Sequence, residues 1–332
     1  MKNSTSYRLA FFMDPMEGIL PDKDTTFALM LEAQKRGHQV LYFTPAEMRI
    51  QAGRPWAALQ EVEVFRPKRP GQPHFRPAGQ SKEPLAKADM VLMRVDPPVT
   101  IEYVLLTQFL DLIPPPTVVV NRPVGLRTAG EKLFTLHYPD LIPPTIISRR
   151  IAELKDFLKE VGGKMVVKPI NARGGDEVFI VEARDPNLNV ILEAATRYQT
   201  RFTFAQKYLP AAKKGDKRII VLSGEPIGAT LRVPQAGEHR ANIHVGGSCR
   251  KAEITRRDRE ICSRLAPALR SLGLHLVGLD VIGGFLTEVN VTSPTGVQEI
   301  DRLDHVCLEE RIWDYFEWLI QTAKQASKPA SA

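Results

Sequence analysis

The feature that most constrains this chain is a hairpin pattern near its C-terminal end. Residues 277–291 contain two apolar runs separated by Gly283-Gly284, which is the pattern of two antiparallel strands joined by a tight turn. Side chains alternate between the two faces of a strand, so Glu288 and Asn290 point the same way and Val289 points the other. The sequence therefore predicts a hairpin with one apolar face, which packs on a core, and one polar face.

The polar face of this hairpin offers oxygen ligands. Asp280 joins Glu288 on that face if the turn has three residues, whereas a two-residue turn places it opposite Thr287. The apolar alternation around Asp280 favours the three-residue turn. Two carboxylates and an amide carbonyl, with no histidine or cysteine within residues 277–291, suit a hard cation such as Mg²⁺. The alternative is a hairpin edge that faces solvent.

The composition is that of an ordinary globular protein. A chain of 332 residues with 43% hydrophobic and 25% charged residues can bury large cores, and it is long enough for two or three subdomains. Its three cysteines are scattered and odd in number, which favours a reducing compartment over a disulfide framework. The first residues are polar, and the apolar run that follows them is too short for a signal peptide or a membrane span. We therefore expect a cytoplasmic protein that does not bind membranes.

The formal net charge of +7 is compatible with nucleic-acid binding and equally with an enzyme that acts on small anions. The densest basic stretch, residues 66–77, is rich in proline and can sustain neither a helix nor a central strand. We interpret it as a solvated loop. An RNA-binding arm is the alternative.

Two β-α-β patterns occupy the first 120 residues. The expected elements are, in chain order, a strand at 8–13, a helix at 24–36, a strand at 39–44, a strand at 90–94, a helix at 101–112 and a strand at 117–120. Such units form a parallel sheet, in which ligands gather beyond the carboxyl ends of the strands. Asp14, Arg94, Asp96 and Asn121 fall at those ends, where they either bind a ligand or cap the strands. No Gly-x-Gly-x-x-Gly follows the first strand, so a dinucleotide-binding fold has little support.

We place a domain boundary near residue 125, where proline clusters punctuate the chain. An N-terminal α/β domain then covers 1–124, a second unit covers 125–325 and a tail covers 326–332. The second unit is α+β, with a division after residue 206. Its expected strands lie at 145–148, 165–168, 177–181, 202–206, 218–222, 227–232 and in the hairpin. Its expected helices lie at 151–161, 187–198, 256–272 and 306–320.

Residues 166–179 have the pattern of a strand, a glycine loop and a strand. Consecutive glycines, Gly174 and Gly175, let backbone N–H groups converge on a phosphate, and Lys168 adds a positive charge at the strand end. A plain glycine turn beside a surface lysine is the alternative. Residues 203–210 have the pattern of a strand followed by a short apolar connector, whose backbone groups could bind an adenine. A core strand followed by a turn has the same pattern.

The segment 232–248 is long and punctuated by glycine, which favours a lid. Arg218, at the start of an earlier strand, suits a bidentate contact with a carboxylate or phosphate. His239 and His244 lie near no recognisable nucleophile or metal-ligand partner, so we expect them to make ordinary polar contacts.

The order of these motifs resembles that of bacterial glutathione synthetases, which are ATP-grasp ligases. The matching segments are 12–15, 23–28, 93–98, 130–134, 168–169, 174–175, 206–210, 216–218, 232–247, 280 and 288–294. The resemblance spans residues 8 to 320 and is far more specific than any single motif. It implies an N-terminal parallel-sheet domain followed by a two-subdomain ATP-grasp fold.

The resemblance also implies a role for each matched residue. Those implied to bind ATP are Lys132, Lys168, Gly174, Gly175, Gln206, Lys207, Tyr208, Leu209 and Asp216. Those implied to hold the peptide carboxylate and steady an acyl phosphate are Arg218, Arg232, Arg240, Gly246 and Gly247. Those implied to bind substrates are Asp14, Arg94, Asp96, Asn242, Ser293, Pro294 and Thr295. Mg²⁺, or Mn²⁺ in its place, would be held by Asp280, Glu288 and Asn290.

The reaction implied by the resemblance joins γ-glutamylcysteine and glycine at the expense of ATP and gives glutathione, ADP and phosphate. The carboxylate of the dipeptide attacks the γ-phosphate, and the amine of glycine then displaces phosphate from the mixed anhydride. A closed lid is needed because water would hydrolyse that anhydride. The resemblance further implies a homo-oligomer whose partners are small molecules, with no role for nucleic acid.

The chain departs from the family in its phosphate loop, which usually reads Asp-Gly-x-Gly-Gly. Here Ala172 and Arg173 precede the glycines, and Asp176 and Glu177 follow them. An alanine at positive φ costs about 1–2 kcal/mol, and two acids beside a triphosphate weaken its binding. Ser248 stands where an arginine is common in the family. The metal ligands are unchanged, so we expect an active ligase.

Two alternatives stay open. One is an ATP-grasp ligase for another pair of carboxylate and amine, because the nucleotide machinery is easier to recognise than the acceptor site. The other is a nucleotide-binding or RNA-associated protein without ligase activity, which the altered loop and the basic proline-rich stretch suggest.

Overall fold

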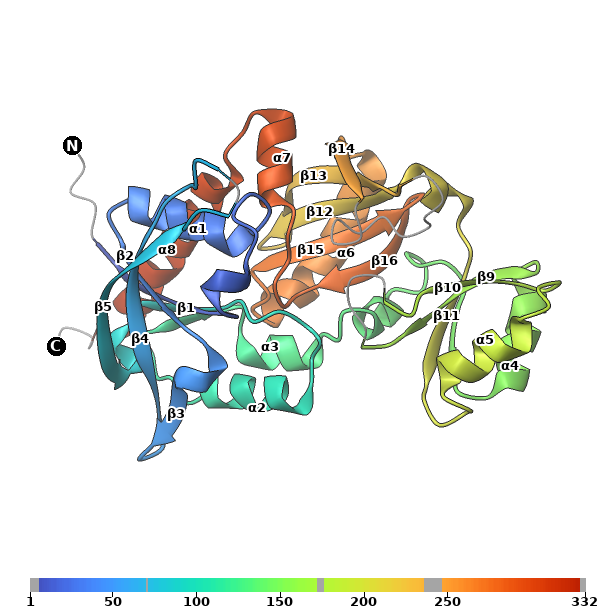
Figure 1. Ribbon diagram of the computed structural model, residues 1–332, viewed down its shortest axis with the longest axis horizontal. Helices are drawn as coiled ribbons and strands as arrows, with labels where there is room; N and C mark the ends of the chain where they lie inside the picture. Colours follow the sequence, from blue (N-terminus) through green and yellow to red (C-terminus); the bar gives the residue numbers. More distant parts are fainter. Residues whose placement is uncertain (1–5, 70, 172–175, 236–246, 329–332) are drawn as a thin grey trace.

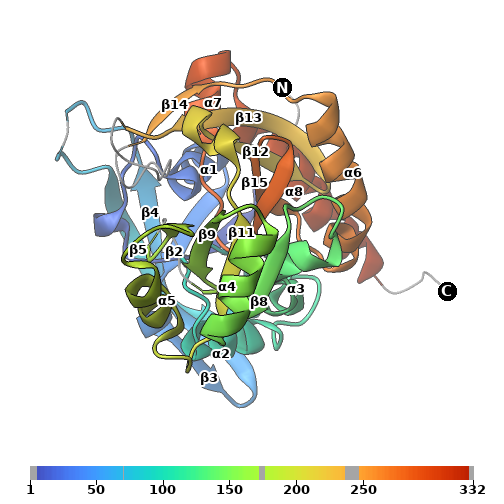
Figure 2. The same ribbon diagram turned by 90° about the vertical axis from the view of Figure 1, so that its right-hand side faces the viewer.

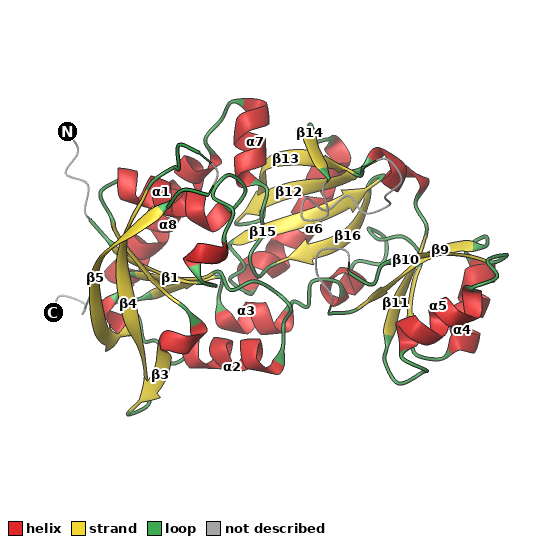
Figure 3. Cartoon of the chain, viewed as in Figure 1, coloured by secondary structure: helices red, strands yellow, loops and turns green. Residues whose placement is uncertain are grey.

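The computed structural model describes residues 6–69, 71–171, 176–235 and 247–328. Three β-sheets follow one another along the long axis of the molecule, and helices pack on each of them (Figure 1). The second sheet and its two helices form a separate lobe at one end, as the colouring by secondary structure shows (Figure 3).

The first sheet confirms both predicted β-α-β units. Its parallel strands, in order of pairing, are β2 (Gln39–Phe43), β1 (Arg8–Phe12), β6 (Met90–Met93) and β7 (Val118–Val120). The crossover helices are α1 (Thr25–Lys35) and α2 (Ile101–Leu110), and each begins at a side-chain cap, provided by Asp24 and Thr100.

Alternate residues of β1 enter different cores, as expected for a strand covered on both faces. Leu9 and Phe11 pack with α1 and with the C-terminal helix α8 (Leu308–Ala326), while Ala10 and Phe12 pack on the side of α2. Trp313 of α8 is fully buried and donates its indole N–H to the carbonyl of Leu29 at 2.8 Å. The last helix of the chain is therefore part of the first domain's core.

An antiparallel extension of the first sheet was not predicted. It consists of β3 (Met48–Gln51), β4 (Arg54–Val64) and β5 (Phe75–Pro84), with β4 pairing with β2. Residues 75–77, predicted as part of a solvated loop, lie in β5, so that prediction is wrong at this end. β5 pairs only with β4, and an edge strand tolerates prolines because some of its N–H groups need no partner. The described residues 65–69 and 71–74 do lie outside strands.

The second sheet has the order β10-β9-β11-β8 and an apolar core of its own. Its elements are β8 (Thr145–Ser148), α4 (Ile151–Glu160), β9 (Lys164–Pro169), β10 (Phe179–Glu182), α5 (Leu188–Thr196) and β11 (Thr203–Lys207). Figure 2 looks onto this lobe, with the third sheet beyond it.

The third sheet has the order β14-β13-β12-β15-β16 and is antiparallel throughout. Its strands and its covering helix are β12 (Asp216–Leu222), β13 (Glu225–Val233), β14 (Ser248–Lys251), α6 (Arg256–Ser271), β15 (Leu276–Ile282) and β16 (Phe285–Asn290). After residue 122, two α-helices and one strand were not predicted from the sequence. They are α3 (Pro123–Thr128), α7 (Val297–Asp304) and β14.

The first and third sheets share apolar cores, because each of the two large buried clusters contains residues of both. Asn121 fastens them together: its amide donates to the carbonyls of Leu276 and Val291, and its oxygen accepts from the N–H groups of His275 and Leu276. The side chain of Asn121 therefore joins the two sheets. The sequence had predicted that it binds a ligand or caps its own strand, and its observed contacts differ from both roles.

Candidate active site

In the hairpin of β15 and β16, Asp280 pairs with Glu288 as predicted, but the turn differs from the predicted one. Ile282 pairs with Phe285, so the turn is only Gly283-Gly284, with φ values of 58° and 82° that suit glycine. The prediction of a three-residue turn is therefore wrong. A β-bulge at Thr287 adds the missing residue, and Asp280 pairs with Glu288. The Thr287 hydroxyl donates to the carbonyl of Asp280 at 3.1 Å, which holds the bulge.

Asp280 lies in a cluster of buried charges. Arg218, its partner on β12, approaches it with Nε at 2.6 Å and Nη2 at 3.2 Å from the two carboxylate oxygens, and Arg232 adds a contact of 2.9 Å. Burial alone would raise the pKa of Asp280, but the two guanidinium groups hold it below its usual value. Asp280 is thus an anion at neutral pH, as a metal ligand must be.

Asp216 and Arg232 complete this cluster across the pair of β12 and β13. They form a buried ion pair, yet Oδ1 of Asp216 and Nε of Arg232 have no hydrogen-bond partner in the described residues. Burial raises the pKa of Asp216 to about 6, and the negative charge of Asp280 adds to the effect. Polar atoms left in this condition are typical of a site that binds a polar ligand.

Lys132 and Glu131 approach β16 from the segment that precedes the second sheet. Lys132 Nζ lies 2.9 Å from Oε1 of Glu288, which brings the predicted phosphate-binding lysine to the predicted metal ligand. The carbonyl of Glu131 accepts from the N–H of Val289 at 2.8 Å, and its carboxylate accepts from the hydroxyl of Thr292 at 2.9 Å. Burial and the negative charge of Glu288 raise the pKa of Glu131 to about 7.

Glu131 was missed from the sequence. Its contacts fall on either side of Asn290, so it fixes the strand that carries two of the three metal ligands. The only signal available was its position beside Lys132. A single acid next to a matched lysine has no spacing pattern that distinguishes it from a surface residue.

Lys168 comes from β9 of the other lobe and faces the same cluster. Burial lowers its pKa to about 8, and the charges of Glu288, Lys132 and the two aspartates Asp216 and Asp280 also act on it. Its ammonium lies 5.1 Å from the centre of the Phe204 ring, a cation–π contact. Two lysines from different sheets and the polar face of the hairpin therefore meet at one place.

The carboxyl edge of the first sheet contributes the remaining charged groups. Arg94 is buried and donates to the Thr26 hydroxyl at 2.9 Å and to the carbonyl of Pro294 at 3.0 Å. Asp14 accepts from the N–H of Asp96 at 2.9 Å. Thr295, next to Pro294, accepts from Arg218 through its carbonyl at 3.1 Å. The loop after β16, which includes Ser293, is thus held between the first sheet and the charged cluster.

Comparison with known proteins decides what this arrangement belongs to. Sequence models of the N-terminal domain and of the ATP-grasp domain of prokaryotic glutathione synthetase match residues 7–127 and 131–305. The chain belongs to the prokaryotic glutathione synthetase family. It is therefore an ATP-dependent ligase that forms carbon–nitrogen bonds, with the activity of a glutathione synthetase.

Individual relatives agree with the family. The glutathione synthetase of Gloeobacter violaceus is 42% identical over 326 residues, which cover 96% of this chain and 98% of that protein. The glutathione synthetase of Thermosynechococcus vestitus is 44% identical over 311 residues, which cover 92% of this chain and 98% of that protein.

Solved structures confirm the ATP-grasp fold. The ATP-grasp ligase PsnB complexed with a minimal precursor, Mg and ADP has a TM-score of 0.61 at 16% identity and covers 94% of this chain and 98% of that one. The D-cycloserine synthetase DcsG has a TM-score of 0.59 at 14% identity, covering 92% and 99%. At these identities the likeness concerns the fold alone.

The strand that this family resemblance assigns to adenine is tied into the second sheet. Gln206 is buried and donates to the Thr145 hydroxyl at 3.0 Å. The N–H of Lys207 donates to Pro144 and that of Tyr208 to Lys164, so neither is available to a nucleotide.

Several predicted residues lie outside the described part of the chain: Gly174, Gly175, Arg240, Asn242 and Gly246, with Ala172, Arg173, His239 and His244. Gly247 is the first described residue after the second gap. Glu177, one of the two acids after the glycine loop, has its carboxylate 2.6 Å from Arg201. Its charge is thus paired within the second lobe, which reduces its effect on a triphosphate.

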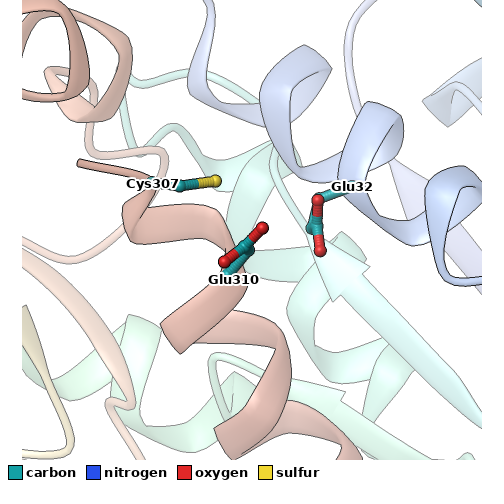
Figure 4. Close-up of side chains that lie close together, drawn as sticks. All are labelled: Glu32, Cys307 and Glu310. Carbon is teal, nitrogen blue, oxygen red and sulfur yellow. The ribbon is translucent and has the colours of Figure 1, made fainter. Parts of the chain in front are cut away.

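One cluster of three metal-ligand side chains was found among the described residues: Glu32, Cys307 and Glu310, which project from α1 and from the start of α8 (Figure 4). Lys35 binds both acids, at 3.0 and 2.7 Å, and Arg36 binds Glu32 at 2.9 Å. These cations neutralise the carboxylates, so the cluster joins two helices. In the described ranges, no helix is long and apolar enough to cross a membrane.

Proposed function

We propose that the cluster around the β15–β16 hairpin is the active site of glutathione synthesis in this chain. The observation that supports it best is that Asp280 pairs with Glu288 on a face that also receives Arg218, Arg232 and Lys132. Cations for a carboxylate, cations for phosphates and oxygen ligands for a metal are what phosphoryl transfer to a carboxylate requires.

Asp280, Glu288 and Asn290 would hold Mg²⁺. The donor set fits, because the two carboxylates are paired and Asn290 lies two residues further along β16. A carboxylate has about four lone-pair sites, so Asp280 can accept from Arg218 and Arg232 and still bind a cation. When bound, Mg²⁺ neutralises phosphate charge and orients the phosphate chain.

In the first step, Lys132 and Lys168 would orient the phosphates of ATP. Arg218 and Arg232 would hold the cysteinyl carboxylate of γ-glutamylcysteine, whose oxygen attacks the γ-phosphorus as the bond to ADP breaks. The protein supplies no nucleophile for this step, only position and charge. The products are ADP and an acyl phosphate.

In the second step, the amine of glycine attacks the acyl carbon and phosphate leaves. The loop of Ser293, Pro294 and Thr295 is held by Arg94 and Arg218 at the edge of the cluster, and we assign the acceptor to it. The intermediate must be kept from water, and the resemblance assigns that role to the segment 240–247, of which only Gly247 is described. Asp14 and Asp96 would complete the substrate side of the site.

Some assignments go beyond the family. Mn²⁺ as a substitute ion, homo-oligomeric assembly and a cytoplasmic location remain predictions, as does the domain boundary near residue 125.

Phosphate release tests the proposal. Purified protein with ATP, Mg²⁺, γ-glutamylcysteine and glycine should release phosphate and form glutathione in equal amounts. Omission of the dipeptide should abolish both, and a panel of amines should show glycine as the best acceptor. Release with another peptide or amine alone would overturn the assignment of substrates, and no release with any acidic peptide would overturn the assignment of the site.

A further inference from the structure

A thiol lies beside the charged cluster, on the pair of β13 and β14. Cys249 pairs with Arg232 in the register of the two strands, so both side chains leave the sheet on the same face, with Cβ atoms roughly 5 Å apart. α7 packs against both strands (Figure 1). The charges of Glu299 and Arg302, both on α7, act on the thiol together with that of Arg232. Cys249, which is half-buried, thus lies between Arg232 and α7.

A second observation points to a ligand at this place. Arg232 is 5% exposed, and its Nε has no hydrogen-bond partner in the part of the chain that the structure describes. Buried donors of this kind persist mainly where a ligand supplies the missing acceptor. We assign the cysteinyl carboxylate of the dipeptide to this guanidinium group. A dipeptide bound in this way brings its own thiol into the neighbourhood of Cys249.

The three cysteines of the chain differ in their surroundings. Cys262 is 1% exposed, and burial raises its pKa to about 12. Burial raises the pKa of Cys307 to about 11, and neighbouring carboxylates add to the rise. Burial also raises the pKa of Cys249, but the charges of Arg232 and Arg302 oppose the shift. Because the thiolate is the nucleophile, Cys249 is the cysteine most ready to react.

The surroundings of Cys249 also favour one reagent. Glutathione disulfide carries more carboxylates than ammonium groups, so it is an anion at neutral pH. Arg232 and Arg302 attract an anion to the thiol. Each half of this disulfide contains the γ-glutamylcysteinyl unit of the dipeptide, so it matches a site that binds the dipeptide.

We propose that Cys249 is a site of reversible modification, at which the disulfide of the product glutathione blocks the binding of the dipeptide. The thiolate of Cys249 attacks one sulfur of glutathione disulfide, the disulfide bond of the reagent breaks, and reduced glutathione leaves with the proton. The glutathionyl group that stays on Cys249 covers Arg232. An excess of reduced glutathione reverses the exchange. This inference rests on the proposed function, since the reagent resembles the proposed substrate.

Modification by glutathione disulfide is measured on the purified full-length protein, after reduction and removal of the reductant. Mass spectrometry of the intact chain and of its cysteine-containing peptides should find one glutathionyl group, on Cys249. γ-Glutamylalanine has the carboxylates of the dipeptide and lacks the thiol. At ten times its Kd it should slow the modification about tenfold, because it occupies the same site.

The activity of each protein is then compared with that of its own untreated sample. The wild-type protein should lose activity in proportion to the modified fraction and recover it with dithiothreitol. Cys249→Ser should keep its activity during the treatment. Cys307→Ser, which removes the other half-buried cysteine, should lose activity as the wild type does.

Three results would overturn the proposal: no modification of Cys249, modification that γ-glutamylalanine does not slow, or full activity of the modified protein. The second result would show an accessible thiol outside the dipeptide site. Untreated wild-type protein that forms no glutathione would overturn the proposed function instead. The mass measurements would in that case still decide whether a γ-glutamyl dipeptide protects Cys249.

Discussion

The ammonium of Lys132 lies 2.9 Å from a carboxylate oxygen of Glu288. One group is assigned to the phosphates of ATP and the other to the metal, and each neutralises the other. Binding of ATP with Mg²⁺ would give each a new partner of opposite charge. The ion pair of Lys132 and Glu288 thus holds both side chains in place before the substrates bind, and each side chain then changes its partner.

Substitution Glu288→Ala should lower kcat by roughly 100-fold or more, because it removes a metal ligand and the partner of Lys132. The far-UV circular dichroism spectrum should stay that of the wild type. Glu182→Gln breaks an exposed ion pair with Lys164 and serves as the control with near-wild-type turnover. A wild-type kcat in Glu288→Ala would exclude Glu288 from the site.

Substitution Thr292→Val should weaken both stability and metal binding. It removes the hydroxyl that donates to the buried carboxylate of Glu131, which costs about 1–3 kcal/mol of unfolding free energy. The Mg²⁺ concentration for half-maximal activity should rise about 10–100-fold, as for other groups that orient metal ligands. Thr292→Ser keeps the donor and should restore both values. Equal Mg²⁺ dependence in the Val and Ser variants would show that this contact does not position the ligands.

The affinity for ATP should fall above pH 8. The pKa of Lys168 is lowered to about 8, chiefly by burial, so the free protein loses this positive charge as the pH rises through that value. The KM for ATP should then rise by up to about tenfold per pH unit. Lys168→Arg stays charged, so its KM should remain flat between pH 7 and 9.5. The same rise in both proteins would assign the titration to another group.

Asp301 should make the protein less stable as the pH rises, whereas a salt-bridged acid makes a protein more stable as the pH rises. Burial and a hydrogen bond with Glu309 raise the pKa of Asp301 to about 8, above its unfolded value near 4. The folded state thus binds the extra proton, and the stability contribution present below pH 4 is lost as the pH rises towards 8.

The variant Asp301→Asn mimics the protonated side chain and can still accept from the N–H of Leu308. Its melting temperature should exceed that of the wild type at pH 8, by a margin that shrinks towards pH 5. Asp301→Ala, which loses both contacts, should melt below Asp301→Asn at both pH values. A margin for Asp301→Asn that is independent of pH would contradict the raised pKa.

The sequence predicts this protein best where the chemistry is local. The β-α-β units of the first sheet follow from apolar runs and capped helices, as at Asp24 and Thr100. β5 was missed because its prolines argue against a strand, and only its place at the sheet edge permits them. The pairing of Asp280 with Glu288 was predicted from a turn length that is wrong, since a bulge at Thr287 leaves no mark in the hydrophobic pattern.

The site, too, was predicted where its residues belong to local motifs and missed where they depend on contacts between distant segments. Lys132, Lys168 and the hairpin acids belong to recognisable motifs, and the described residues among them lie together. Glu131 acts through contacts with Val289 and Thr292, far along the chain, which neither spacing nor composition reveals. α7 was missed because it begins after Gly296 without a side-chain cap.

Isotope transfer tests the central claim most directly, namely that this cluster phosphorylates the carboxylate of the dipeptide. γ-Glutamylcysteine labelled with ¹⁸O in its cysteinyl carboxylate should be converted with ATP, Mg²⁺ and glycine, and the released phosphate analysed by mass spectrometry. We expect one ¹⁸O atom per phosphate, carried over when glycine displaces phosphate from the acyl phosphate. Glutathione formed together with unlabelled phosphate would contradict it.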